Sequence, residues 1–394
     1  MSKAEAFGSG KIPMQGLPRL IRFFFFADYN RLGGGVKSRI FMKIQLVHKF
    51  EDIISLENLL EAWKEFVNGK RNKKDVQEFS MHLMDNIFSL HSDLINHTYK
   101  HGGYQAFKIN DPKPRDIHKA SVRDRLLHHA IYRILYPFFD KTFIADSYSC
   151  RLNKGTHKAV NKFCSYFYKV SKNNTRTCWV LKCDIRKFFA NINHDILINI
   201  LREYIPDKDI IELLESVILS FISPPPLLEK ERGNANIGLP LGNLTSQLFV
   251  NIYMNKFDQF VKHKLKAKCY IRYADDFVIL SDNKDWLEKQ VEFMRDFLRQ
   301  ELKLELHPDK IFIKTLASGM DFLGLVAFSD HRILRTKTKR RMFKKIENKY
   351  NDWQGGLMPE ESFNQSLQSY FGVLKHCRGY KISQGMRILI DGKR

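Results

Sequence analysis

Apolar residues in the first third of the chain recur at helical spacing. The stretch "SLENLLEAWKEF" carries them at i, i+1, i+4 and i+7, as Leu59, Leu60, Trp63 and Phe66. Ser55 stands directly before this run, in the position of an N-cap residue. The pattern therefore predicts a helix here, a second through "VQEFSMHLMDNIFSLHSDLI" and a third through "RDRLLHHAIYRILYPFF".

Strand patterns enter further along the chain. "GGYQAFKINDPKPRDIHKA" is strand-like but punctuated by prolines, and Trp179 to Cys183 reads as a strand that runs into Asp184. In "CYIRYADDFVIL" two strand-forming runs flank Ala274-Asp275-Asp276, which predicts a hairpin with these three residues as its turn. Strands and helices mix from Thr177 onward, so the expected fold class is α+β.

Composition and charge narrow the function. The 394 residues are 44% hydrophobic and 13% aromatic, enough for a large core divided among two or three subdomains. Lys and Arg outnumber Asp and Glu by 65 to 43, a net charge of +22, which points to a polyanionic partner. No apolar run approaches the roughly 18 residues of a membrane span, so nucleic acid is favoured over a membrane and a cytoplasmic location is expected.

The cysteines predict neither a disulfide nor a zinc site. All six lack Cys-x-x-Cys spacing and a histidine at zinc-ligand spacing, so they are expected to be reduced and mostly buried.

The adjacent carboxylates Asp275 and Asp276 raise a chemical question, because they repel each other. An isolated Asp-Asp pair is often only a turn. Asp184, however, also lies at a strand end, and a sheet can bring the two strand ends together. Carboxylates that close require cations, and two Mg²⁺ ions held by oxygen ligands would satisfy them.

Taken in order, these segments resemble the motifs of reverse transcriptases, which are RNA-directed DNA polymerases. The resemblance covers roughly residues 104–328 and includes "KPRDIHKASVRDRLLHHAI", "SYSCRLNKGTHKAV", Asp184, "GLPLGNLTSQLFVNIYM", "YADD", "LELHPDKI" and the primer-grip "FLG". The segment "GNLTSQ" most resembles the enzymes of diversity-generating retroelements, which copy a template-repeat RNA unfaithfully at adenines.

The resemblance implies a right-hand polymerase with fingers, a palm built on an antiparallel sheet with helices, and a small helical thumb. The expected divisions are an N-terminal appendage (1–45), fingers with the first palm elements (46–176), the palm (177–330) and a basic helical thumb (331–394). Met42 is an alternative working start, with residues 1–41 dispensable.

The resemblance also assigns roles at the centre. Asp184 and Asp275 would bridge two Mg²⁺ ions, Asp276 would be a further ligand, and the backbone carbonyl of Ile185 would add an oxygen. In this two-metal reaction one ion activates the primer 3′-hydroxyl and the other holds the triphosphate. The implied partners are an RNA template, a DNA or RNA primer and dNTPs, with a small basic accessory protein as a further candidate.

Other residues match nucleotide-binding positions of the family. Phe189 matches the aromatic steric gate that excludes a 2′-hydroxyl, the alternative being core packing, which we prefer for Phe188. Lys113 and Arg115 match cations that grip the triphosphate, although on so basic a protein they are equally candidates for solvated surface charges. Lys310 resembles the lysine proposed to protonate the leaving pyrophosphate.

One departure from the family pattern concerns fidelity. Pro240-Leu241-Gly242 stands where many relatives carry Pro-Gln-Gly, and Leu241 removes an amide that could hydrogen-bond near the incoming nucleotide. Leu241 and Gly242 are therefore expected beside that nucleotide, and low fidelity is expected from the loss. The alternative is a tolerated apolar substitution without effect.

The tail is expected to bind duplex. "TKTKRRMFKKIENKYNDW" places Phe343, Ile346, Tyr350 and Trp353 on one helical face. The remaining face carries cations for phosphates, or a merely solvated charged surface: Lys339, Arg340, Lys344 and Lys345. A further thumb helix is expected in "SYFGVLKHCRGY".

Several functions remain open at this point. The tail after Gly324 is short for a thumb plus a nuclease domain, which disfavours retroviral and complete group II intron enzymes. A defence-associated, CRISPR-linked or group II intron-derived reverse transcriptase stays possible beside the diversity-generating one. A maturase-like RNA-binding protein without activity would share the fold and charge, but the intact carboxylates argue against it. The sequence names neither the RNA nor a diversified gene.

Overall fold

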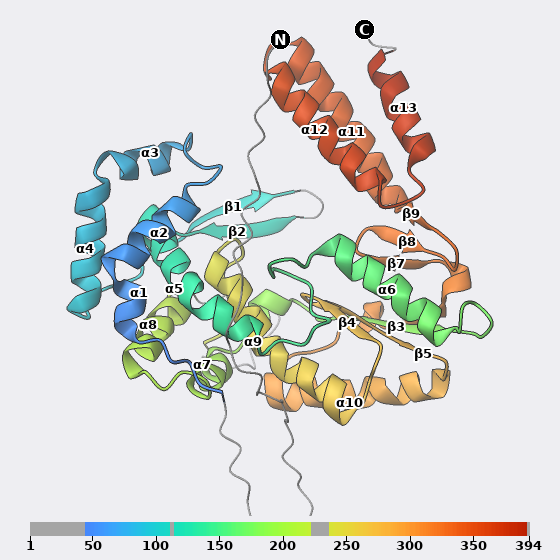
Figure 1. Cartoon of the computed structure of the whole chain (residues 1–394), viewed down its shortest axis with the longest axis horizontal. Coiled ribbons are helices and arrows are strands. Elements are labelled where there is room, and N and C mark those ends of the chain that lie inside the picture. The colour runs from blue at the N-terminus through green and yellow to red at the C-terminus, as the bar shows by residue number, and fades with distance from the viewer. Residues whose placement is uncertain (1–43, 111–113, 222–235, 392–394) are drawn as a thin grey trace, which may run out of the picture. The chain divides into compact units, whose positions relative to one another are not determined.

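The computed structural model describes residues 44–110, 114–221 and 236–391 (Figure 1). The described residues belong to one structural unit, Lys43–Arg394. The expectations for the N-terminal appendage, for a start at Met42 and for Lys113 fall on residues outside those described.

Five helices open the described chain. They are α1 (Phe50–Ile54), α2 (Leu56–Phe66), α3 (Lys74–Met81), α4 (Leu83–Ile95) and, after a hairpin, α5 (Val122–Asp140). The hydroxyl of Ser55 accepts a hydrogen bond from the Asn58 N–H at 3.2 Å, so the predicted cap of α2 is confirmed. The single helix predicted over the next segment is wrong, because His82 adopts φ −121° and ψ 41° and separates α3 from α4.

The hairpin between α4 and α5 consists of β1 (Gln105–Ile109) and β2 (Arg115–Lys119), paired antiparallel. It rests on the segment that precedes helix α9 (Leu244–Gln259). The N–H of His118 donates to the carbonyl of Leu241 at 3.0 Å, and the Asn243 side chain donates to the carbonyl of His118 at 2.9 Å. These bonds fix β2 against the "PLGN" segment.

The central sheet is antiparallel throughout, with the strand order β4-β5-β3-β6. Its strands are β3 (Trp179–Asp184), β4 (Tyr270–Tyr273), β5 (Asp276–Ser281) and β6 (Phe312–Thr315). The predicted β4–β5 hairpin is confirmed, but its turn is shorter than expected: Tyr273 pairs with Asp276, so only Ala274 and Asp275 lie in the turn. The combination of this sheet with helices confirms the α+β class.

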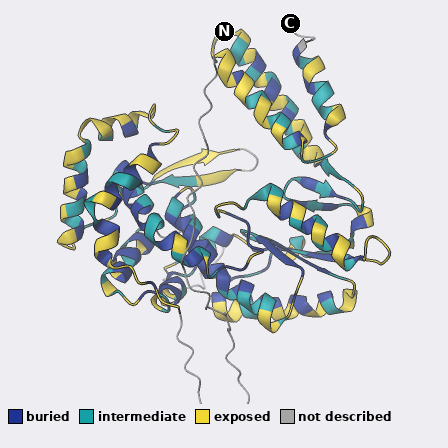
Figure 2. Cartoon of the chain, in the orientation of Figure 1, coloured by how far each residue is buried: buried dark blue, intermediate teal, exposed yellow. Residues whose placement is uncertain are grey.

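Helices cover both faces of the sheet, and two hydrophobic clusters fill the space between. On one face lie α9 and α10 (Lys284–Leu302); on the other lies α6 (Thr156–Val170) (Figure 1). Successive side chains of a strand point to opposite faces. Leu181 and Cys183 of β3 therefore join the first cluster, while Val180 joins the second with Phe163 of α6. Figure 2 shows these strands as the most buried part of the chain.

Two further helices and several short turns complete this part. Helices α7 (His194–Arg202) and α8 (Lys208–Leu219) pack on each other and α7 on α9. Short 3₁₀ segments occur at η1 (Phe188–Asn191), η3 (Pro308–Lys310) and η4 (Leu316–Ser318), and α9 continues into one π-helical turn, η2 (Phe260–Lys264).

The C-terminal part begins with a three-stranded antiparallel sheet. Its strands β7 (Met320–Phe322), β8 (Leu325–Ala327) and β9 (Arg332–Leu334) lead into α11 (Thr336–Gln354), α12 (Glu360–Leu374) and α13 (Tyr380–Asp391). The helix expected in "SYFGVLKHCRGY" is wrong in its second half, because the chain turns between α12 and α13. A Cβ at Gly379 would lie 2.7 Å from the carbonyl oxygen of Leu374, which explains the glycine at that turn.

None of the described helices combines the length and the apolar character needed to traverse a lipid bilayer.

Candidate active site

Three carboxylates meet at one end of the central sheet. Asp184 is the last residue of β3 and lies directly opposite Asp276, the first residue of β5. Asp275 occupies the adjoining turn, and its carbonyl accepts a hydrogen bond from the N–H of Ile185 at 3.3 Å. The register of two strand pairs thus brings together Asp184, Asp275 and Asp276, which the sequence had singled out.

Two of the three carboxylates lie where ionisation is opposed, Asp275 and Asp276. Asp184 is buried, and the other two are half-buried. Burial raises the pKa of Asp275 to about 6, and the neighbouring charges of Asp184 and Asp276 add to the rise. Burial likewise raises the pKa of Asp276. A group of this kind favours cations, which would stabilise the ionised form.

Two lysines supply part of the positive charge. The Nζ atom of Lys310, in η3, lies 2.7 Å from Oδ1 of Asp184. The carbonyl of Asp184 also accepts a hydrogen bond from the N–H of His307 at 2.8 Å, which anchors the segment that carries Lys310. On β3 itself, the Nζ atom of Lys182 lies 3.7 Å from Oδ1 of Asp276.

Lys182 was missed by the reasoning from sequence. It precedes Asp184 by two residues in a strand, so both side chains point to the same face of the sheet. That spacing was the pattern that could have identified Lys182 as a neighbour of the carboxylates.

The donor set fits magnesium. Asp184, Asp275 and Asp276 offer only carboxylate oxygens, the hard ligands that Mg²⁺ prefers. Ile185, expected to add a backbone oxygen, is 1% exposed and linked to Asp275 through its N–H.

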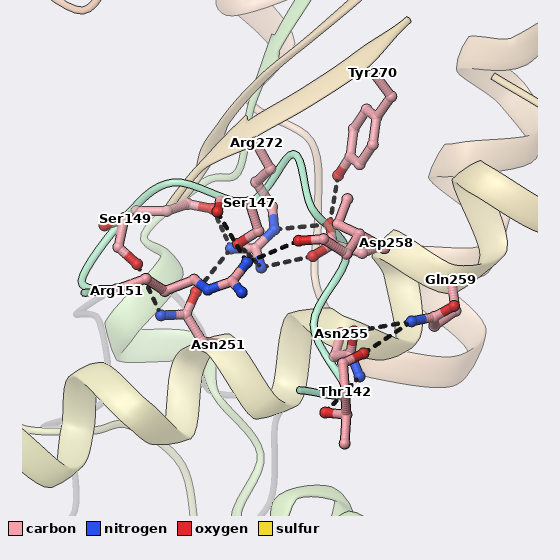
Figure 3. Close-up of polar contacts among 12 residues, drawn as sticks. Thr142, Ser147, Ser149, Arg151, Asn251, Asn255, Asp258, Gln259, Tyr270 and Arg272 are labelled. Atoms are coloured by element: carbon pink, nitrogen blue, oxygen red, sulfur yellow. Dashed lines mark hydrogen bonds and ion pairs between the residues drawn. The ribbon is translucent and has the colours of Figure 1, made fainter. Parts of the chain in front are cut away.

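A buried ion pair holds the turn that carries Asp275 (Figure 3). Arg272 of β4 and Asp258 of α9 are both 0% exposed, and the guanidinium binds both carboxylate oxygens, at 2.8 and 2.7 Å. The hydroxyl of Tyr270 also donates to Asp258, at 2.7 Å. One guanidinium nitrogen reaches the turn itself and donates to the carbonyl of Ala274 at 3.2 Å.

Ala274 requires such support. Its φ of 57° lies in the left-handed region, which costs a residue with a Cβ roughly 1–2 kcal/mol. Arg272 additionally contacts Asn251 and Ser147, at 3.3 and 3.2 Å, so segments far apart in the sequence jointly hold the turn. No role of Arg272 or Asp258 follows from the sequence, because nothing local marks them as partners.

The residues expected near the nucleotide lie around the "PLGN" segment. Phe189, in η1, is half-buried, and its carbonyl accepts a hydrogen bond from the N–H of Leu239 at 2.8 Å. Phe188 is buried, as preferred from the sequence. Gly242 has a φ of 109°, and a Cβ there would lie 2.8 Å from Ile117 of β2, so both backbone and space call for glycine. Arg115, the first residue of β2, is exposed.

The sequence of the chain matches one known protein family. The family described as "Reverse transcriptase (RNA-dependent DNA polymerase)" matches residues 107–327, more than half of the chain. The chain belongs to the reverse transcriptase family. The right-hand polymerase fold expected from the sequence is the fold of this family.

The individual relatives match this chain over only part of their own length. Protein YkfC of Escherichia coli is 27% identical over 58% of this chain and 65% of its own. The group II intron-encoded protein LtrA of Lactococcus lactis is 24% identical over 59% of this chain and 47% of its own. The match thus spans less than two thirds of either relative. A solved telomerase from Candida albicans overlaps with a TM-score of 0.44 at 13% identity, over 73% of this chain and 61% of that one.

Helix α11 lies in the segment expected to form the thumb and carries the cations expected to contact phosphates. Helix α11 buries Met342, Ile346 and Tyr350, while Phe343 is only half-buried. The four residues expected to contact phosphates are all exposed on this helix: Lys339, Arg340, Lys344 and Lys345.

Proposed function

We propose that this protein is an RNA-directed DNA polymerase that extends a DNA or RNA primer on an RNA template with dNTPs. The observation that carries the proposal is the meeting of Asp184, Asp275 and Asp276 at the end of β3 and β5. Membership of the reverse transcriptase family supports it. Bacterial relatives favour a prokaryotic or phage-encoded enzyme acting in the cytoplasm.

In this proposal the three carboxylates hold two Mg²⁺ ions, with the carbonyl of Ile185 as a further ligand. Bound ions of this kind activate the attacking hydroxyl and offset charge on the triphosphate. Lys310, whose Nζ lies 2.7 Å from Asp184, holds a proton near the place where pyrophosphate leaves. Arg115 and Lys113 bind the triphosphate, and the Phe189 ring excludes a 2′-hydroxyl.

Substitution of one carboxylate tests the activity. Asp275→Asn keeps the size of the side chain but removes a charged metal ligand, so primer extension should fall by about a thousandfold or more. Asp282→Asn is the matched control, because Asp282 is an exposed carboxylate just beyond the opposite end of β5. Circular dichroism and RNA binding should be unchanged in both variants. Near-normal extension by Asp275→Asn would remove the site assignment.

We further propose that the enzyme is error-prone at template adenines and serves a diversity-generating retroelement. The resemblance of "GNLTSQ" and the place of Leu241 support this finer assignment. A site that recognises its ligand by hydrogen bonds strongly rejects a wrong ligand. A site that recognises its ligand by shape separates right from wrong by only about 1–3 kcal/mol. Leu241 lacks an amide, so the pocket relies on pairing and stacking. The preference for adenine follows from the resemblance alone.

Single-nucleotide incorporation opposite template A, C, G and U tests this assignment. We expect the wild type to misincorporate most often opposite A, and Leu241→Gln to reduce that excess. Arg115→Ala, which changes a cation proposed for the same pocket, serves as a companion variant. Equal accuracy at all four bases would remove the diversity-generating assignment and leave the polymerase assignment in place.

A second candidate function is that of a group II intron-derived protein, with or without polymerase activity. The observation that favours it is the similarity to the intron-encoded LtrA. Strong RNA binding by a wild-type protein that extends no primer would select a maturase-like role. Extension that is accurate at adenines, on the other hand, would leave the intron-derived, CRISPR-linked and defence-associated enzymes as candidates.

A further inference from the structure

The end of the palm sheet opposite the carboxylates is unusually basic. Strands β3 and β4 both begin there, and six residues of β3 span about 17 Å to Asp184 at the other end. The chain contains no Asp or Glu from Ser147 to Cys183, which includes α6, and none from Gln259 to Ala274, which includes η2 and the loop before β4. Both acid-free segments reach this end of the sheet.

Exposed cations cluster on these two segments. Six of these cations are exposed and form no ion pair with another described residue: Lys169, Lys172, Arg176, Lys264, Lys266 and Lys268. Lys262 connects the segments, because its Nζ lies 5.9 Å from the ring of Tyr166 in α6 and donates a hydrogen bond to the carbonyl of Lys268 at 3.0 Å. The nearest carboxylate to it, Asp146, is already bonded to Lys262 and Tyr166.

A groove with aromatic walls adjoins the same helix. It has a volume of about 410 Å³ and lies between α6 and the turn that joins β8 to β9. Tyr168 of α6, which is 39% exposed, lines one side. On the other side, the ring of Phe328 stacks on His331 at 4.8 Å and 13°. The acid of this turn, Asp330, is paired with His331 and Arg378.

We propose that these six cations and the adjoining groove, together the α6 surface, bind single-stranded RNA outside the polymerisation site. Binding of single strands combines cations that follow the phosphates with aromatic rings on which bases stack. The α6 surface offers both, because Lys169 follows Tyr168 directly in α6 and Lys172 lies just beyond the end of that helix. A membrane surface would instead need protruding apolar side chains, whereas these rings line a recess.

This inference does not depend on the proposed polymerase activity. RNA held at this end of the sheet, which lies about 17 Å along β3 from Asp184, would be a part of the template molecule that is not being copied, or a separate structured RNA with a single-stranded segment. Either would keep the protein attached to its RNA while the primer terminus leaves the site.

The test uses the full chain and a labelled oligouridylate of about 20 nucleotides, longer than the roughly 4–16 nucleotides of a typical single-strand site. An excess of unlabelled primer–template hybrid occupies the polymerisation site. The variant carries Lys169→Gln, Arg176→Gln, Lys264→Gln and Lys268→Gln. Its affinity for the oligouridylate should fall about tenfold or more. The slope of log affinity against log salt concentration should flatten by up to about 2.8, since each lost single-strand contact removes about 0.7 from that slope.

The matched control neutralises four exposed lysines elsewhere: Lys73, Lys100, Lys141 and Lys289. It should bind the oligonucleotide within about twofold of the wild type at the same salt concentration. Tyr168→Ala separates stacking from charge: it should weaken binding about fivefold or more and leave the salt slope unchanged.

Three results would overturn the inference. The first is a wild type that binds no oligouridylate once the hybrid is present, and the second is an unchanged affinity and slope in the quadruple Gln variant. The third is a quadruple variant that loses binding to phosphatidylserine vesicles but not to RNA, which would make the surface a membrane contact. Primer extension on saturating hybrid should be unchanged in this variant, whereas Asp184→Asn should lose extension and keep oligouridylate binding, so the two proposals fail separately.

Discussion

The buried pair of Arg272 and Asp258 should govern both the stability of the palm and the position of Asp275. Arg272→Met replaces the guanidinium with an apolar side chain of similar length. The substitution removes five hydrogen bonds, two to Asp258 and one each to Asn251, Ser147 and the carbonyl of Ala274. Of the side-chain hydrogen bonds that described residues donate to Asp258, the one from Tyr270 alone would remain, while Asp258 stays wholly enclosed.

The expected loss follows from that uncompensated charge. Removing one partner of a buried ion pair costs about 3–5 kcal/mol, since the other charge is left desolvated. A typical protein unfolds with about 5–15 kcal/mol, so Arg272→Met should lose a large part of the stability. Asp258→Leu should cost a similar amount. The loss of unfolding free energy in the double variant should be smaller than the sum of the two single losses, by about 2 kcal/mol or more. The reason is that the double variant leaves no isolated charge.

Urea unfolding monitored by circular dichroism measures these free energies. Primer extension at low temperature measures the activity of the protein that remains folded. Arg202→Met is the control, since Arg202 pairs with Glu215 at the surface and should change stability by less than about 1 kcal/mol. We expect Arg272→Met to slow extension even where it is folded, through release of the Ala274 turn. A cost below about 1 kcal/mol, or strict additivity in the double variant, would refute the reasoning.

Two further predictions concern the nucleotide and the duplex. Phe189→Ala should admit ribonucleotides, because a steric gate discriminates by exclusion, and single-turnover incorporation of dNTPs against rNTPs measures it; an unchanged preference would make the ring core packing. Neutralising Lys339, Arg340, Lys344 and Lys345 should weaken primer–template binding and flatten its salt dependence by up to about 0.9 per lost contact, as measured by fluorescence anisotropy across salt concentrations. An unaltered slope would return these residues to a solvated face.

The carboxylate site was predictable because its pattern is local. Runs of strand-forming residues mark β3, β4 and β5, and each carboxylate falls at or beside the end of one of these runs. Antiparallel pairing then brings Asp184 opposite Asp276 without any further information. The turn was predicted one residue too long, since turn residues such as Asp are also tolerated as the first residue of a strand.

The supporting contacts were not predictable, because they join segments with no mutual sequence pattern. Asp258 lies in a helix and Arg272 in a strand, and only the packing of α9 against the sheet makes them partners. The contact of Gly242 with Ile117 likewise depends on where the β1–β2 hairpin rests. The break at His82 was not predictable for another reason. Apolar residues keep a helical period across it, and neither Gly nor Pro marks it.

The division of β3 between two hydrophobic clusters bears on how the molecule comes apart. Val180 belongs to the cluster that includes residues of α6, of β7 to β9 and of α11, while Leu181 and Cys183 belong to the cluster that includes residues of α9 and of α1 to α5. Neither cluster can be lost without disturbing this strand. The two clusters therefore share one cooperative element, and loosening of either would reach Asp184 through the backbone that both hold in place.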